Sequence, residues 1–187
     1  MDKKHLSLLI PAALIPYISL GAVVFILNST KPVFSWIMDR IFSDNGLIFA
    51  AVILLICLVA AALGIIGFVK SIREKWDAIP MAKTIMWIKL CQIPAYVAIF
   101  VLGMIMAITI FTIPFAIALF LLDCLALTVT GLLNFSAVLA ACREGKTTWK
   151  KSWWVAALQM VFCADVVASV IFYFCLQRSV QPTEDTQ

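Results

Sequence analysis

Long apolar runs separated by short polar segments dominate this chain. A helix needs about 20 apolar residues to cross the hydrocarbon of a bilayer. Four runs reach that length, and one of them is long enough for two spans. The predicted spans cover residues 6–27, 47–69, 90–111, 115–141 and 154–176. We therefore predict an all-α polytopic membrane protein, with a single domain over residues 1–187 built as a bundle of five transmembrane helices.

The third and fourth spans are predicted from one continuous apolar run. The run from Leu90 to Cys142 is too long for one span and has the length of two spans with a tight turn. We place the turn near Thr112–Pro114, because proline disfavours helix in the residue before it. The alternative is a single span accompanied by a re-entrant segment.

Two further patterns lie in the first third of the chain. Residues 31–43 alternate apolar and polar positions with the period of a helix, and Pro32 suits a first helical position. We predict a short helix lying on the membrane interface there. The second span carries Gly64 and Gly67 among alanines, and small residues at such spacing let another helix approach closely.

Composition and charge place these helices in a membrane and orient them. The chain is 64% hydrophobic and 13% charged, with a mean hydropathy of +1.08, whereas soluble domains are about one quarter charged. The 14 Lys and Arg residues gather at span ends, mainly in two loops predicted over residues 70–89 and 143–152. Positive loops face the cytoplasm, so we predict a cytoplasmic N-terminus and an external C-terminus. The net charge of +4 is explained by this distribution, and no nucleic-acid partner is expected.

Two acids inside predicted spans are the strongest candidates for a functional site. Asp123 lies in the fourth span and Asp165 in the fifth. An acid at the centre of a membrane helix costs about 2.5–3.5 kcal/mol to insert, so both should face protein or water. Counted along the predicted spans at 1.5 Å per residue, both lie near the midplane of the bilayer.

Polar residues accompany each acid on its helix face. Thr130 and Asn134 follow Asp123 at helical spacing, and Ser169 follows Asp165 one turn later. No Lys or Arg lies at this depth in any predicted span, so the acids are predicted to lack a cationic partner. The five residues form either a proton- or cation-binding site or a hydrogen-bonded network that fixes helix packing.

The sequence supports two function hypotheses. The first is a small transport or permeation protein, proton- or cation-linked through the midplane acids and forming homo-oligomers. The second is a non-catalytic accessory, immunity or assembly subunit of a larger membrane complex, docking through the small-residue face of the second span and the interfacial helix. The familiar hydrolase, metalloprotease and phosphate-binding motifs are missing, so we expect no enzyme, no metal and no cofactor. The bacterial plasma membrane is the expected location, with the lipid bilayer itself as a partner.

Overall fold

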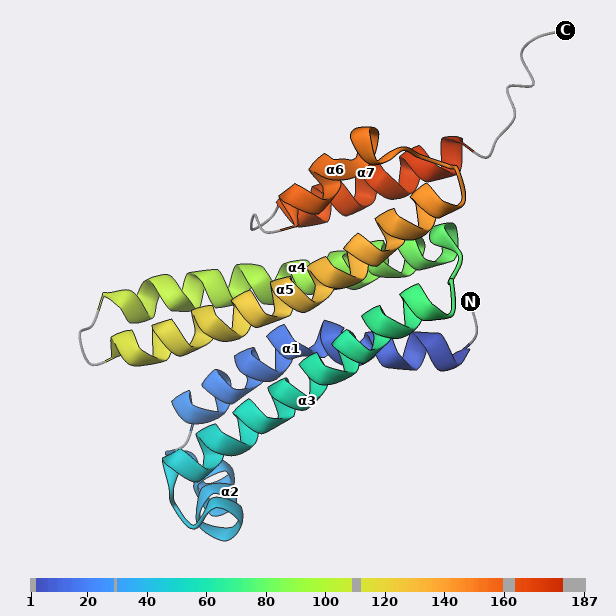
Figure 1. Cartoon of the computed structure of the whole chain (residues 1–187). Helices are drawn as coiled ribbons and strands as arrows, with labels where there is room; N and C mark the ends of the chain where they lie inside the picture. Colours follow the sequence, from blue (N-terminus) through green and yellow to red (C-terminus); the bar gives the residue numbers. More distant parts are fainter. Residues whose placement is uncertain (1–2, 29, 109–111, 160–163, 180–187) are drawn as a thin grey trace, which may run out of the picture.

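The fold was obtained as a computed structural model, which describes residues 3–28, 30–108, 112–159 and 164–179. This part of the chain forms seven α-helices (Figure 1). Their bounds are α1 Lys3–Leu27, α2 Pro32–Phe42, α3 Gly46–Arg73, α4 Ala78–Ala107, α5 Ile113–Arg143, α6 Trp149–Leu158 and α7 Ala164–Arg178. The all-α prediction is confirmed.

Four of these helices, α1, α3, α4 and α5, are long and apolar enough to cross a membrane. They pack as a bundle in which α1 contacts α3 and α4, and α5 contacts α3 and α4 (Figure 1). They correspond to the first four predicted spans, so the chain is a multi-span membrane protein. The run from Leu90 to Cys142 belongs to two long helices, and α5 begins at Ile113 with Pro114 in its first turn. The described residues thus favour two spans over the re-entrant alternative.

The predicted loop over residues 70–89 is largely helical, which corrects the sequence analysis. Helix α3 continues to Arg73, and α4 begins at Ala78. Buried residues recur along the first turns of α4 at intervals of three and four, and they are Ala78, Met81, Ala82, Ile85, Ile88, Lys89 and Gln92. That spacing is one face of an α-helix, and its burial against the bundle outweighs the charged residues on the other face.

The fifth predicted span, 154–176, is also corrected. Helix α6 ends at Leu158 and α7 begins at Ala164, with residues 160–163 outside the described part. At 1.5 Å per residue, the 10 residues of α6 and the 15 of α7 extend about 15 Å and 22 Å. Neither reaches across a hydrocarbon layer of about 30 Å.

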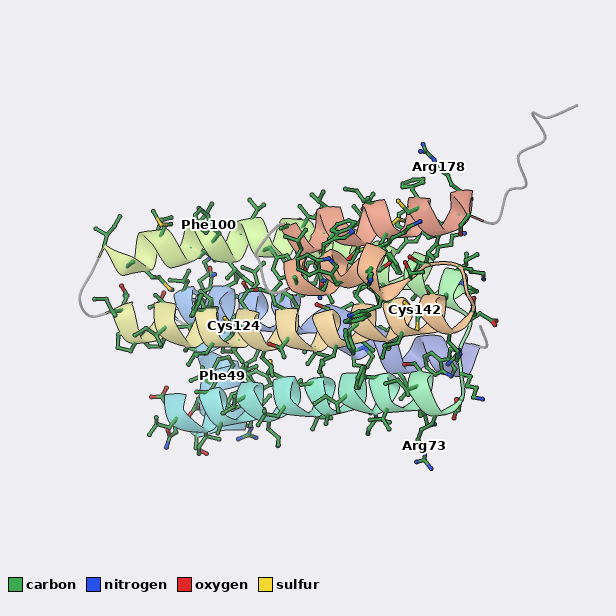
Figure 2. The ribbon with its side chains drawn as sticks, turned by 45° about the horizontal axis from the view of Figure 1, so that its top comes forward. Phe49, Arg73, Phe100, Cys124, Cys142 and Arg178 are labelled. Atoms are coloured by element: carbon green, nitrogen blue, oxygen red, sulfur yellow. The ribbon has the colours of Figure 1, made fainter. Side chains whose placement is uncertain are left out.

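Helices α6 and α7 lie side by side and antiparallel (Figure 1). A pocket is lined by Lys146 and Ser152, beside the start of α6, together with Cys175 and Leu176 at the end of α7. The end of α7 therefore returns to the end of the bundle where α5 finishes, and Figure 2 shows Arg73, Cys142 and Arg178 toward that same end. We call it the basic end.

The predicted fifth span placed the C-terminus on the opposite side from the N-terminus; residues 180–187 lie outside the described part, so the side of the C-terminus stays a prediction. Leu8 and Leu9 of α1 contact Gly67 near the end of α3, so the first turns of α1 also lie at the basic end. Which end faces the cytoplasm stays a prediction from the distribution of charge.

The short helix predicted over residues 31–43 is confirmed as α2. Pro32 is in its first turn, and Lys31 is the N-cap residue without a side-chain cap bond. None of its residues is buried. Contact with the bundle is aromatic: Phe34 packs against Phe25 and Phe42 against Phe49, with ring centroids 5.2 Å and 5.1 Å apart.

Helix α1 stays continuous although Pro11 and Pro16 lie inside it. A proline has no N–H, so Pro16 leaves the carbonyl of Ala12 without its usual partner. The side chain of Gln92 from α4 fills this role: its Nε2 donates to the carbonyl of Ala12 at 3.2 Å and of Ala13 at 3.4 Å. Prolines are tolerated in membrane helices when a neighbour satisfies the freed backbone in this way.

A carboxylate from the end of α5 caps the start of α4. The N–H of Ala78 donates to Oε1 of Glu144 at 2.8 Å, and Lys146 donates to the other oxygen at 2.5 Å. Partial burial by itself would raise the pKa of Glu144, but these two hydrogen bonds and the charges of Lys146 and Arg143 together hold the pKa below its ordinary value. Glu144 thus performs for α4 the capping that Asp77, its N-cap residue, does not.

We expect Glu144→Gln to lower the free energy of unfolding by about 1 kcal/mol, because a charged cap at a helix N-terminus is lost. The contribution of wild-type Glu144 should be complete above its unfolded-state pKa near 4.5 and should vanish as pH falls through the lower folded-state pKa. The check is denaturant unfolding of the detergent-purified protein between pH 3 and 7. Asp39→Asn on exposed α2 is the control. An equal loss in both variants, or a Glu144→Gln effect that persists at pH 3, would contradict this role.

Candidate functional site

A fully buried ion pair joins α4 to α7. Nζ of Lys89 lies 2.5 Å from Oδ2 of Asp165, and both side chains have no exposed surface. Asp165 belongs to the first turn of α7, where the partial positive charge of the helix N-terminus also favours a carboxylate. The prediction that the acids lack a cationic partner is therefore wrong for Asp165.

The sequence contains a signal for Lys89 that the span assignment obscured. Lys89 is the last residue of the charged segment 70–89, which the sequence predicts to be a cytoplasmic loop. It nevertheless shares a helix face with Ile85, four residues before it, and Gln92, three residues after it. Both of these residues are buried. A lysine at such a position on a buried face requires a buried acidic partner.

Hydrogen bonds extend the site from Asp165 toward α5. Nδ2 of Asn134 donates to Oγ of Ser169 at 2.8 Å, and that hydroxyl donates to the backbone carbonyl of Asp165 at 2.7 Å. The structure thus brings three of the five predicted site residues together. Oδ1 of Asp165 is buried and has no hydrogen-bond partner among the described residues.

Tyr96 of α4 connects this cluster with the remaining predicted residues, and sequence reasoning missed it. Its hydroxyl donates to Oε1 of Gln92 at 3.1 Å, and it lies near Thr130 and within electrostatic range of Asp123 and Asp165. Thr130 itself donates to its own helix, to the carbonyl of Ala126 at 2.9 Å. The signal for Tyr96 was again helical spacing, four residues after Gln92.

Asp123 lies apart from the ion pair, in a groove between α4 and α5. The side chain is 6% exposed, and its Oδ1 has no hydrogen-bond partner among the described residues. Lys89 is eleven residues from the start of α4, and Asp123 is twenty from the end of α5. These separations correspond to about 16 Å and 30 Å from the basic end at 1.5 Å per residue, so the backbone of Asp123 lies farther from that end than the backbone of Lys89.

A further buried polar side chain, Gln159, lies where α6 ends, near the first described turn of α7. Gln159, the C-cap residue of α6, is buried against Gly131 of α5, where a Cβ would lie 3.3 Å from the Cβ of Gln159. Its Nε2 donates to the carbonyl of Val155, while its Oε1 has no partner among the described residues. Two short helices thus present polar side chains, Gln159 and Asp165, toward the interior of the bundle.

Comparison with known proteins gives one match. A family model described as "Family of unknown function (DUF6652)" matches residues 8–178. A search of curated proteins and a search of solved structures found nothing that matches.

Proposed function

We propose that this chain, which belongs to the family of unknown function DUF6652, is a proton- or cation-linked transport protein with Lys89, Asp165 and Asp123 as its ion-binding groups. The observation that carries the proposal is the buried ion pair between Lys89 and Asp165. Ionisable residues within membrane segments are rare and usually mark ion or proton pathways. Here Lys89 and Asp165 meet at the first described turn of α7.

The arrangement of α7 supports this function. In many transporters, helix ends at membrane depth surround the substrate or coupling ion, because unpaired backbone groups and helix dipoles are available there. Asp165 is in the first described turn of α7, and Gln159, the C-cap residue of α6, packs against Gly131 of α5. Oδ1 of Asp165, which no donor in the described part of the chain contacts, offers an acceptor beside the bond to Lys89.

The proposed cycle uses Lys89 as an internal counter-ion. In the resting state its ammonium neutralises Asp165. A proton or cation that binds Asp165 neutralises its carboxylate and so weakens its attraction for the ammonium of Lys89. Lys89 then moves toward Gln92 and Tyr96. Release of that proton or cation on the other side of the membrane restores the ion pair. Between binding and release the bundle carries one positive charge, on Lys89, next to the side-chain oxygens of Gln92 and Tyr96.

The test is ion flux in proteoliposomes. Vesicles loaded with the pH dye pyranine receive a potassium gradient and valinomycin. Uptake of ²²Na⁺ and ⁸⁶Rb⁺ is measured in separate vesicles without valinomycin, because this ionophore itself carries Rb⁺. We expect flux of at least one ion above protein-free vesicles, and loss of it in the charge-neutral double variant Lys89→Met/Asp165→Asn. Flux in that variant at the wild-type rate, or wild-type flux equal to that of empty vesicles, would overturn the proposal.

A role as an accessory subunit is the second candidate, and one observation favours it. Val33, Trp36 and Ile41 of α2 are 63–65% exposed and leave an apolar face uncovered. The other docking surface expected for this role, the small-residue face of α3, is already occupied by α1 and α5. A stoichiometric membrane partner that co-purifies with wild-type protein, and is lost in Trp36→Ser, would support the accessory role.

A further inference from the structure

The groove that contains Asp123 has the size of a small-molecule site. It encloses about 510 Å³ between α4 and α5, within the range of roughly 300–1,000 Å³ for ligand pockets. Apart from Asp123 and Cys124, its lining is hydrocarbon, aromatic, glycine and thioether. These other residues are Ile99, Phe100, Gly103, Met104, Ala116, Leu119, Phe120 and Leu127.

A buried carboxylate stays ionised only with a positive partner, and the described residues supply none to Asp123. Lys89 is already bonded to Asp165. The other basic residues of the described helices lie within about two turns of a helix end, whereas Asp123 is about 15 Å from the nearer end of α5. A second copy of this chain therefore offers no cation at the depth of Asp123 either.

The lining and the surroundings of the groove define the ligand further. Phe100, Met104 and Phe120 are 60–65% exposed on helices that cross the membrane, so the groove opens toward lipid. One carboxylate in hydrocarbon is a poor site for an inorganic cation, since hard metal ions take six or more oxygen ligands. An organic cation with apolar substituents satisfies both the carboxylate and the apolar walls.

We propose that the groove between α4 and α5 binds a lipophilic organic monocation, such as a hydrophobic amine or a quaternary onium ion, with its charge at Asp123 and its apolar groups against Phe100, Gly103 and Phe120. This assignment names the solute class of the transport proposed above and rests on it in that respect. The ligand enters from the bilayer, where its apolar groups concentrate it.

Binding is tested on purified full-length protein in detergent. Equilibrium dialysis with tritiated tetraphenylphosphonium measures the lipophilic cation, and tetraphenylborate serves as an anion of the same shape. We expect saturable binding of one tetraphenylphosphonium per chain and no saturable binding of tetraphenylborate. Unsaturable uptake, or equal binding of the two ions, would overturn the assignment as mere partition into apolar surface.

Three variants locate the site. Asp123→Asn removes the charge, and Gly103→Leu fills the groove, since nothing lies within 4 Å of a Cβ at Gly103. Each should weaken tetraphenylphosphonium binding at least tenfold. Gly21→Leu, at an equally open glycine of α1 outside the groove, should leave it unchanged. Thermal unfolding of each variant establishes that it is folded, and wild-type affinity in folded Asp123→Asn would overturn the proposal.

The failures of the two proposals are distinguishable. Suppose that wild-type protein shows ion flux, that Lys89→Met/Asp165→Asn loses it, and that no tetraphenylphosphonium binds. The transport proposal then stands, and the proposed solute class is overturned. Binding that depends on Asp123 without any flux supports the groove as a ligand site and overturns transport. A membrane polypeptide that co-purifies with wild-type protein and is released by Asp123→Asn would show that a basic helix, not a small cation, fills the groove.

Discussion

Lys89→Met should destabilise the protein by about 3–5 kcal/mol, the largest effect we expect from a single substitution. The variant leaves Asp165 buried without a counter-charge, and loss of one partner from a buried ion pair has a cost of this size. Asp165→Leu should cost a similar amount by stranding the ammonium. The measurement is reversible unfolding of the purified protein by sodium dodecyl sulfate in mixed micelles.

The double variant distinguishes the net contribution of the ion pair to stability from the cost of leaving one charge unpaired. Lys89→Met with Asp165→Leu removes both charges and fills the space with apolar groups, so its stability should return to within about 1 kcal/mol of wild type or exceed it. Lys83→Met is the matched control, because Lys83 is an exposed lysine six residues earlier on α4, and it should change stability by less than about 0.5 kcal/mol. Additive losses in the double variant would mean that the two residues act independently.

Gly64→Ala should destabilise the contact between α3 and α5 by about 1–3 kcal/mol. A Cβ at Gly64 would lie 2.3 Å from Cγ1 of Val129, closer than any real contact, and overpacking of a well-packed core has this cost. Val129 is β-branched and cannot rotate its methyl away freely. The same unfolding titration measures the effect.

Two companions test the cause. Gly64→Ala combined with Val129→Ala should recover part of the loss, because the clashing methyl is removed. Gly21→Ala, where no atom lies within 4 Å of the new Cβ, should be neutral or slightly stabilising through the higher helix propensity of alanine. If Gly64→Ala behaved like Gly21→Ala, the close approach of α3 and α5 would not be needed for stability.

Sequence patterns predicted the features of this fold that depend on residues close together in the chain. Apolar length predicted four membrane-crossing helices, Pro114 located the turn before α5, and the period of residues 31–43 with Pro32 predicted α2. Each depends on residues within a few turns of one another. For the same reason the small-residue face of α3 was recognised, although its neighbours, α1 and α5, were not.

The parts that sequence reasoning missed depend on distant partners. Lys89 looks like a surface lysine at the end of an apolar run, and its partner is 76 residues away. The run 154–176 has the length of a span, but it contains Gln159 and Asp165, whose polar groups lie at the inner ends of two shorter helices. The ion pair between Asp165 and Lys89 joins the first described turn of α7 to α4, and no periodicity within that run reveals it.

The contact of Gln92 with α1 also bears on how the protein is made. The carbonyl of Ala12, freed by Pro16, receives its hydrogen bond from a side chain 80 residues later in the chain. At roughly 5–20 residues per second of synthesis, α1 waits about 4–16 s for that donor. During this interval α1 is an incompletely bonded helix in an apolar solvent, a state that favours its retention at the insertion machinery until α4 arrives. Biogenesis of the bundle would then proceed by delayed release of its first helix rather than by independent insertion of each one.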